Sequence, residues 1–202
     1  MLAGQPFDLL GASTAFSRNE EVFGEGEPAD YLYKVMSGGV RTYNTLSDGR
    51  RQIAAFYLPG DIFGLEARDV HSVSAETIAR SRLHAVKKTE LMSRAAGDLA
   101  MVNLLLDLTT VELQRTRAHI LLLLKSAQER VVSFLLDMAD REDCENEFDL
   151  RMSRQDIADY LGLSIETVSR TLTRLESASV ISLLTSRRIM LRDRPALDRL
   201  NV

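Results

Sequence analysis

Residues 153–172 carry the pattern that most restricts how this chain can fold: a small residue, a glycine four positions later, and a β-branched residue six positions after the glycine. These residues are Ala158, Gly162 and Val168. Two short helices joined by a tight turn must pack closely, so Ala158 leaves room at the crossing and Val168 fills the space between them. Gly162 permits the left-handed backbone that ends the first helix. The spacing is that of a helix-turn-helix; an ordinary helical hairpin is the alternative.

Helix-capping residues support this interpretation. Ser153 followed by Asp156 predicts a capped start for the first helix, and Ser164 predicts the start of the second. The inward faces of the two helices consist of Ile157, Ala158 and Leu161, and of Val168, Leu172 and Leu175.

The exposed face of the second helix has side chains that can recognise DNA bases. Glu166 can accept a hydrogen bond from a cytosine amino group, and Arg170 can donate two hydrogen bonds to guanine. The alternative is a surface ion pair, because the two residues are four positions apart. The complete set of candidate DNA-binding residues on this helix is Ser164, Ile165, Glu166, Thr167, Ser169, Arg170 and Arg174.

A β-hairpin is predicted after this helix. Residues 180–184 and 188–191 are rich in β-branched and aliphatic side chains. The tip between them includes Ser186, Arg187 and Arg188, which suit contacts to DNA phosphates that position the protein without specifying sequence. We therefore predict a winged helix.

The distribution of charge agrees with a nucleic-acid partner at the C-terminal end. The chain has a net charge of −4. Residues 151–202 contain nine arginines and six acidic residues, a net charge of +3, so the remainder of the chain has a net charge of −7. Arginine suits bidentate contacts to phosphate and guanine. Charge alone does not separate this from an arginine-coated surface.

The central part of the chain predicts one long helix. Apolar and threonine side chains recur at steps of three and four from residue 99 to residue 123, with no glycine or proline in between. Such a heptad seam commonly meets a second copy of itself, and a parallel homodimer is favoured over a helix buried within one protomer. The candidate dimerisation residues are Leu99, Val102, Leu106, Thr109, Leu113, Thr116 and Ile120.

The two sides of this helix are expected to differ. Leu104, Leu105 and Leu108 add apolar surface that would pack on the N-terminal part of the chain. Glu112, Gln114, Arg115 and Arg117 are expected on the exposed flank.

The N-terminal part has the pattern of an antiparallel barrel or sandwich. Short β-prone runs from residue 16 to residue 86 are separated by turn signals. The clearest turns are Ser37–Gly39, Ser47–Gly49 and Leu58–Asp61.

A further helix is predicted over residues 127–138, with Val131, Phe134, Leu135 and Met138 facing inward. The acidic segment 140–147 is interpreted as a solvated hinge. It contains the one cysteine, Cys144, for which a redox role is the minor alternative.

The composition limits other functions. No apolar run is long enough to span a membrane and the first residues lack the basic start of a signal peptide, so a cytoplasmic location is expected. The three histidines show no metal-ligand spacing, and no metal site is expected. An enzyme on a cupin-like barrel would need clustered histidine and carboxylate ligands, so we expect no enzymatic activity.

These residues, in this order, resemble the CRP/FNR family of bacterial regulators over nearly the whole chain. Residues 26–33 with Ser37–Val40 are similar to the opening strands of the family, and Pro59–Gly64 to its glycine turn. Glu166 followed by Ser169 and Arg170 is similar to the recognition signature of the FNR branch. The resemblance implies double-stranded DNA with TTGAT-like half-sites in a palindrome, and contact with RNA polymerase.

Two departures narrow the resemblance to the FixK type, whose members regulate microaerobic and nitrogen-fixation genes. The cyclic-AMP sensors of the family hold the cyclic phosphate with an arginine, whereas the corresponding position here is Val73, so binding of a cyclic nucleotide is not expected. The cysteine cluster of true FNR proteins is absent from the leader, so we expect no iron–sulfur cluster, and no cofactor at all.

The expected fold is therefore α+β: an N-terminal antiparallel β-roll over residues 1–97, a dimerisation helix over 98–124 and a C-terminal winged helix-turn-helix over 125–202. The β-roll would be a double-stranded β-helix like that of cyclic-nucleotide-binding domains. The expected function is a sequence-specific DNA-binding transcriptional activator. The alternative is a regulator whose β-roll holds an unidentified effector, with His71, Arg82 and His84 as candidate ligand contacts.

Overall fold

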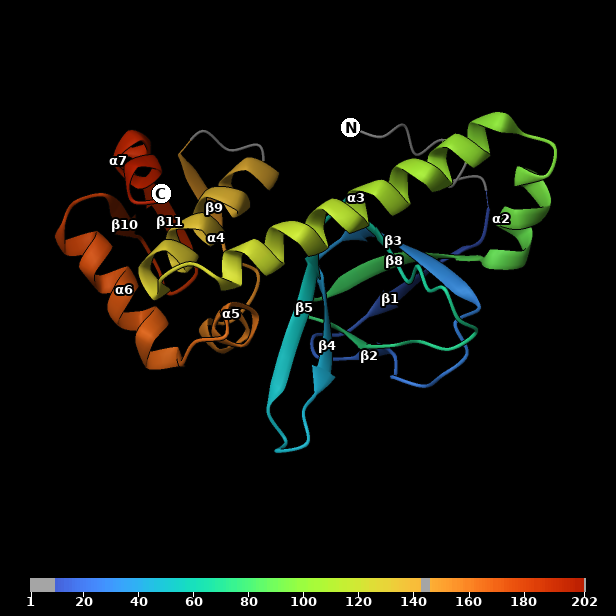
Figure 1. The fold of residues 1–202 in the computed structure, drawn as a ribbon, viewed down its shortest axis with the longest axis horizontal. Helices are drawn as coiled ribbons and strands as arrows, with labels where there is room; N and C mark the ends of the chain where they lie inside the picture. The colour runs from blue at the N-terminus through green and yellow to red at the C-terminus, as the bar shows by residue number, and fades with distance from the viewer. Residues whose placement is uncertain (1–9, 143–145, 202) are drawn as a thin grey trace. The chain divides into compact units, whose positions relative to one another are not determined.

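The computed structural model describes residues 10–142 and 146–201. The chain divides into two compact units, residues 1–116 and 117–202 (Figure 1). The elements of the first unit are β1 (Ala12–Phe16), β2 (Glu21–Phe23), β3 (Tyr31–Ser37), β4 (Val40–Thr45), β5 (Arg51–Tyr57), β6 (Ile62–Phe63), β7 (Ser74–Thr77), β8 (Ser81–Lys87) and α2 (Lys88–Ala95). Helix α3 (Leu99–Leu123) begins in the first unit and ends in the second.

The first unit is a β-roll made of two four-stranded antiparallel sheets. Their strand orders are β1-β8-β3-β6 and β2-β7-β4-β5. One core cluster fills the roll and includes Val35, Val40, Phe63 and Leu83, which are all buried. The alternation of these apolar residues with outward-facing ones along the strands explains why two sheets form around one core.

The predicted turns join the strands in two different ways. Ser47–Gly49 closes the β4–β5 hairpin within one sheet, whereas the turn at Gly38 carries the chain from β3 in one sheet to β4 in the other. Gly38 has a φ of +84°, and a Cβ there would lie 2.6 Å from the carbonyl oxygen of Arg80. Both the backbone conformation and the close approach therefore require glycine.

A second core cluster joins the outer face of one sheet to α2 and α3. Leu32 and Val86 from the sheet pack with Met101, Leu104 and Leu108 of α3. The prediction that one flank of α3 packs on the roll is confirmed for Leu104 and Leu108.

The second unit contains the end of α3, a group of helices and a small sheet. Its elements are α4 (Ala127–Arg141), β9 (Glu147–Asp149), α5 (Arg154–Leu161), α6 (Ile165–Ser177), β10 (Ile181–Leu183), β11 (Arg188–Leu191) and α7 (Arg194–Arg199). The sheet is antiparallel in the order β10-β11-β9. The four residues of α4 that were predicted to face inward are all buried.

The interpretation of residues 140–147 as a simple hinge is wrong at both ends. Helix α4 continues to Arg141, and Glu147 already belongs to β9. Two acidic residues of the segment pair with arginines beyond it: Asp140 with Arg194, 54 positions away, and Glu142 with Arg151, nine positions away. These contacts have no signature in the local sequence. Cys144 lies outside the described residues.

The predicted fold class is confirmed: an antiparallel β-roll, a long helix and a winged helix-turn-helix follow one another along the chain. The division at residues 97 and 124 stays a prediction. Among the described residues, no helix is long and apolar enough to cross a membrane.

Candidate nucleic-acid interface

Helix α5 has a defined start and end. The Ser153 hydroxyl accepts a hydrogen bond from the Asp156 N–H at 3.1 Å, and the Asp156 carboxylate accepts one from the Ser153 N–H at 2.8 Å. At the other end Gly162 takes a left-handed conformation with φ +63°, and the Leu163 N–H donates to the Ala158 carbonyl at 3.0 Å. The predicted capping and glycine turn are therefore present, and they fix where α5 ends.

The crossing of α5 and α6 is closely packed. Ala158, Leu161 and Val168 are all 0% exposed. The rest of the inward face of α6, Leu172 and Leu175, is also buried. Because the inner side of α6 is committed to this core, its outer side is held in one orientation.

The first turn of α6 is capped by Ser164, whose hydroxyl accepts from the Thr167 N–H at 3.2 Å. Glu166 lies in this turn, where its own backbone N–H and the Ser164 side chain, with a further contribution from Arg170, favour the charged carboxylate. They hold the pKa of Glu166 below its ordinary value. The carboxylate is therefore an anionic acceptor at neutral pH.

The exposed side of α6 contains the residues predicted to read bases. Ile165, Glu166, Arg170 and Arg174 are exposed, and Ser169 is half-buried beside them. Thr167 is also half-buried, and its hydroxyl lies 3.1 Å from that of the cap residue Ser164. The face therefore offers one carboxylate acceptor and guanidinium donors at successive turns.

The wing is the β10–β11 hairpin. At its tip the Thr185 hydroxyl accepts from the N–H groups of Arg187 and Arg188, at 3.2 Å and 2.9 Å. Ser186 at the tip is exposed. The Arg188 guanidinium lies 2.5 Å from Glu147 and 3.8 Å from Asp149, both on β9. Arg188 is exposed and has carboxylate partners that the sequence did not predict, whereas Arg187 is half-buried.

Three residues that the sequence analysis did not single out connect the helix-turn-helix to the end of α3. They are His119, Arg130 and Tyr160. The Arg130 guanidinium donates to the carbonyls of Leu123, Lys125 and Leu161, at 2.7 Å, 2.9 Å and 2.9 Å. His119 of α3 stacks on Tyr160 with ring centroids 4.1 Å apart, and its Nε2 lies 2.9 Å from the Tyr160 carbonyl oxygen. These contacts tie the end of α3 to α5. No spacing in the sequence marks them.

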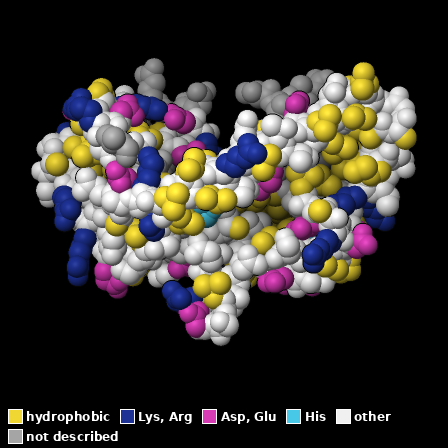
Figure 2. Space-filling model, viewed as in Figure 1, with side chains coloured by type: hydrophobic (Ala, Val, Ile, Leu, Met, Phe, Trp, Pro, Cys, Tyr) yellow, Lys and Arg dark blue, Asp and Glu magenta, His cyan; other side chains and the backbone are white. Residues whose placement is uncertain are grey.

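The predicted dimerisation residues form an exposed apolar stripe on α3. Leu99 is 74% exposed, Leu106 60%, Leu113 49% and Ile120 57%. Thr109 and Thr116 are exposed with their hydroxyls bonded to backbone carbonyls of the preceding turn, and Val102 is half-buried. Figure 2 shows hydrophobic side chains gathered along this helix. A single protomer leaves the stripe in contact with solvent.

The predicted exposed flank of α3 needs a correction. Gln114 and Arg117 are exposed, but Glu112 and Arg115 are half-buried against the β-roll. Glu112 accepts a hydrogen bond from the Tyr57 hydroxyl, and Arg115 donates one to the Asp61 carboxylate. The sequence could not show this, because both partners lie more than fifty positions away.

The candidate effector contacts of the β-roll lie in different surroundings. His71 is buried and stacks on Phe23 with centroids 3.5 Å apart, and its Nδ1 lies 3.7 Å from a Glu66 oxygen. Burial lowers the pKa of His71 despite the attraction of Glu66. His84 is buried between Ser13 and the Leu10 carbonyl, and Arg82 is exposed.

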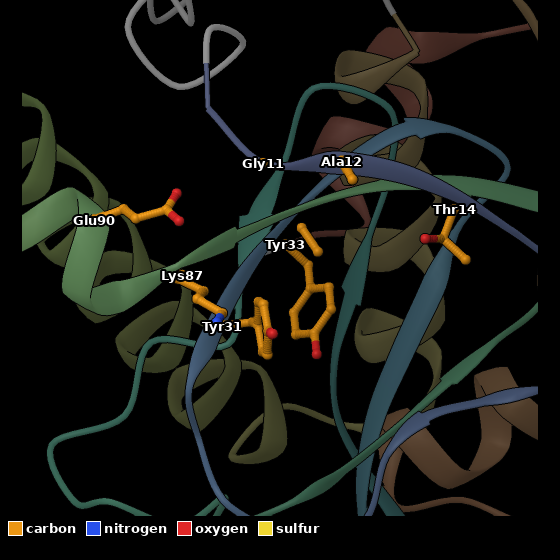
Figure 3. Close-up of a pocket in the computed structure, with 8 residues that line it drawn as sticks. Gly11, Ala12, Thr14, Tyr31, Tyr33, Lys87 and Glu90 are labelled. Atoms are coloured by element: carbon orange, nitrogen blue, oxygen red, sulfur yellow. The ribbon is translucent and has the colours of Figure 1, made fainter.

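A shallow pocket of about 380 Å³ lies at β1, β3 and β8. Tyr31 and Tyr33 lie side by side in it, with Lys87 and Glu90 near its edge (Figure 3). None of the three candidate effector residues lines this pocket. Among the described residues no group of three or more histidine, cysteine, aspartate or glutamate side chains could hold a metal ion.

Comparison with known proteins agrees with this architecture. Residues 13–96 match the family described as the cyclic nucleotide-binding domain, and residues 129–200 match the Crp-like helix-turn-helix domain. The solved structure of FixK2 from Bradyrhizobium japonicum superposes with a TM-score of 0.92 and 43% identity, covering 96% of this chain and 98% of that one.

Curated relatives extend the comparison. The nitrogen fixation regulation protein FixK of Azorhizobium caulinodans is 52% identical over 95% of this chain and 80% of its own length. The FixK protein of Rhizobium meliloti is 40% identical over 86% of this chain and 80% of its own length. With a β-roll, a long central helix and a Crp-like winged helix in this order, the chain belongs to the CRP/FNR family of transcriptional regulators.

Proposed function

We propose that this protein regulates transcription as a homodimer that reads a palindromic DNA site with one α6 helix in each half-site. The observation that carries the proposal is the outer face of α6, where Glu166 and Arg170 are exposed while Ala158 and Val168 are fully buried. A helix fixed on its inner side and polar on its outer side can enter the major groove as a rigid reader.

The base contacts follow from the chemistry of this face. Arg170 would donate to guanine O6 and N7, Glu166 would accept from a cytosine amino group, and Ser169 would add a polar contact beside them. These roles fit a TTGAT-like half-site, which contains a G·C pair. Ser186 and Arg187 at the wing would contact phosphates.

The exposed stripe on α3 supports the homodimer. Leu106 and Leu113 are large apolar side chains that remain exposed in one protomer, and their seven-residue spacing matches a parallel two-stranded seam. Pairing two such helices would bury the stripe and bring two α6 helices into one dimer. The two-fold symmetry of the protein would then match a palindrome.

The β-roll supports activity without a cyclic nucleotide, although the domain family implies that ligand. Val73 packs against the apolar cluster inside the roll, where the sensors of the family have an arginine. Arg41 of β4 is 5% exposed and pairs with Glu76 at 2.8 Å, so its charge is already balanced. The residues present therefore do not fit an anionic phosphodiester.

The names of the relatives indicate which genes this protein would regulate. Because its relatives are named for the regulation of nitrogen fixation, we assign this protein to FixK-type control of nitrogen-fixation and microaerobic genes, as an activator that contacts RNA polymerase. Such a regulator acts where the chromosome lies, in the cytoplasm.

The test is binding to a labelled duplex that contains two TTGAT-like half-sites in inverted orientation. Binding is measured by fluorescence anisotropy at moderate salt. We expect two chains per duplex and at least ~10³-fold preference over a scrambled duplex. Equal binding to both duplexes, or one chain per duplex, would contradict the proposal. Thermal unfolding with cyclic nucleotides checks effector independence, since a ligand at 100 times its Kd would stabilise the protein by about 2.7 kcal/mol.

A further inference from the structure

A cluster of four polar side chains holds the middle of α3 on the β-roll. The Tyr57 hydroxyl donates to Glu112 Oε1 at 2.8 Å, and the Arg115 guanidinium donates to the Asp61 carboxylate. Arg115 also lies 5.6 Å above the Tyr57 ring and 3.9 Å from Glu112. Tyr57 and Asp61 belong to the roll and Glu112 and Arg115 to α3, so this latch cluster joins two elements that are distant in sequence.

The partners on the β-roll are fixed points. Asp61 closes the turn after β5, where its second carboxylate oxygen accepts from the Leu58 N–H at 2.7 Å. The backbone of the same turn is bonded to β3, since the Val35 N–H donates to the Asp61 carbonyl at 2.9 Å. Tyr57 is 5% exposed at the end of β5. Both partners are therefore held in place by contacts within the roll itself.

The charges in the latch cluster are stable and partly shielded from water. Burial lowers the pKa of Arg115, but the attraction of Asp61 and Glu112 outweighs it and the pKa is raised. Burial, together with Glu112, raises the pKa of the Tyr57 hydroxyl, which therefore stays protonated as a donor. The Arg115 and Asp61 side chains are 29% and 17% exposed, so their attraction is less screened than that of a surface pair.

The latch cluster continues the inward face of α3 by polar means. Met101, Leu104 and Leu108 fix the first half of the helix through apolar contacts, and Glu112 and Arg115 follow at steps of four and three. Residues at this spacing share one helix face. The seam lies on another face, so the latch cluster determines how the second half of the seam is turned about the helix axis.

We propose that Tyr57, Asp61, Glu112 and Arg115 are positioning residues for operator recognition: by fixing the rotation of α3 on the β-roll they set the separation of the two α6 helices. The inference rests on the homodimer of the proposed function. It deepens that function by naming side chains that hold the DNA-binding geometry in the absence of an effector.

The end of α3 provides the second part of this linkage. His119 contacts the Tyr160 carbonyl of α5, and Arg130 joins the Leu123 and Leu161 carbonyls. The last turns of α3 are therefore held on the helix-turn-helix within the second unit.

The experiment compares Arg115→Gln and Tyr57→Phe with the wild type, using Arg117→Gln as the matched control. Arg117 is an exposed arginine on the same helix outside the latch cluster. Arg115→Lys, which keeps the positive charge, tests rescue. Each dimer is measured by anisotropy at a concentration where sedimentation shows full dimerisation. One duplex has the preferred half-site separation and the other has one inserted base pair.

We expect Arg115→Gln to bind the preferred duplex about tenfold more weakly, the loss of one charge-assisted contact. We also expect it to discriminate less between the two duplexes, because the half-site separation is no longer fixed. Tyr57→Phe should change both measurements in the same direction but less, Arg115→Lys should restore most of the discrimination, and Arg117→Gln should behave as the wild type.

Unchanged discrimination in Arg115→Gln and Tyr57→Phe, with or without weaker binding, would overturn the inference, because a merely structural role lowers affinity for both duplexes equally. If Arg115→Gln does not fold, Tyr57→Phe, which removes one hydroxyl, decides alone. A wild type that is monomeric or ignores the palindrome would overturn the proposed function itself, and this inference with it.

Discussion

Arg170 is the side chain on which base discrimination is expected to depend most. It is exposed on α6, whose inner face is buried, and a guanidinium can make two hydrogen bonds to one guanine. Arg170→Ala should therefore weaken binding to the preferred site by ~1–3 kcal/mol and relax preference at one base pair. Competition anisotropy with single-base variants of the site measures both effects. Arg199→Ala, at an exposed arginine of α7, is the control. A uniform loss on every duplex would instead make Arg170 a phosphate contact.

The wing arginines give a paired prediction. Arg187 lies half-buried at the tip, while Arg188 is exposed and pairs with Glu147 and Asp149 of β9. Arg187→Ala should weaken binding to all sequences alike and lower the salt-dependence slope by about one unit, as expected for one lost phosphate contact. Arg188→Ala should lower the slope less, because carboxylates already balance its charge. Salt titrations of both variants test this, and equal slopes for the two would refute the distinction.

At the scale of single elements, Gly162 is the position where local backbone preference decides the structure. Its φ of +63° is left-handed, and a Cβ there would meet its nearest atoms at 3.6 Å and 3.7 Å, an ordinary contact distance. Gly162→Ala should therefore destabilise the second unit by ~1–2 kcal/mol through backbone conformation alone. Thermal unfolding measures this loss. Gly97→Ala is the control, because Gly97 has open space around it, and a loss as large there would contradict the explanation.

The elements that sequence could predict are those with local rules. The caps at Ser153 and Ser164 and the turn at Gly162 depend on residues only a few positions apart, and all are present. Strand β9 and the pairing of Glu142 with Arg151 depend on contacts across the second unit, so no pattern marks them. The same holds for Arg130, whose three carbonyl partners lie in α3, in the segment between α3 and α4, and in α5.

The residues of the candidate interface also differ in whether the sequence could predict their positions. Periodicity placed Glu166 and Arg170 on the exposed face of α6, because an amphipathic helix must turn its polar side outward. Periodicity also placed Glu112 and Arg115 on an exposed flank of α3, and there it was wrong. Periodicity shows which residues share a helix face, but it does not show that Tyr57 and Asp61 of the β-roll pair with two of them.

At the scale of the whole molecule, DNA recognition is expected to depend on pairing along α3. Leu106 and Leu113 are 60% and 49% exposed, so replacing both with glutamate should leave the thermal stability of the protomer nearly unchanged. Charges facing each other across a parallel seam should nevertheless abolish dimers, and operator binding with them. Sedimentation and anisotropy on one sample check both effects. Leu121→Glu, exposed but off the seam, is the control. Variant monomers that still bound the operator tightly would contradict the dependence.

The most direct measurement of the central claim is selection of preferred sites by the wild-type protein from a pool of random duplexes, with the oligomeric state determined on the same preparation. A dimer that enriches an inverted repeat of TTGAT-like half-sites, about one helical turn between centres, is the predicted result. Enrichment of a single asymmetric site, or no enrichment at all by a monomeric protein, would contradict it.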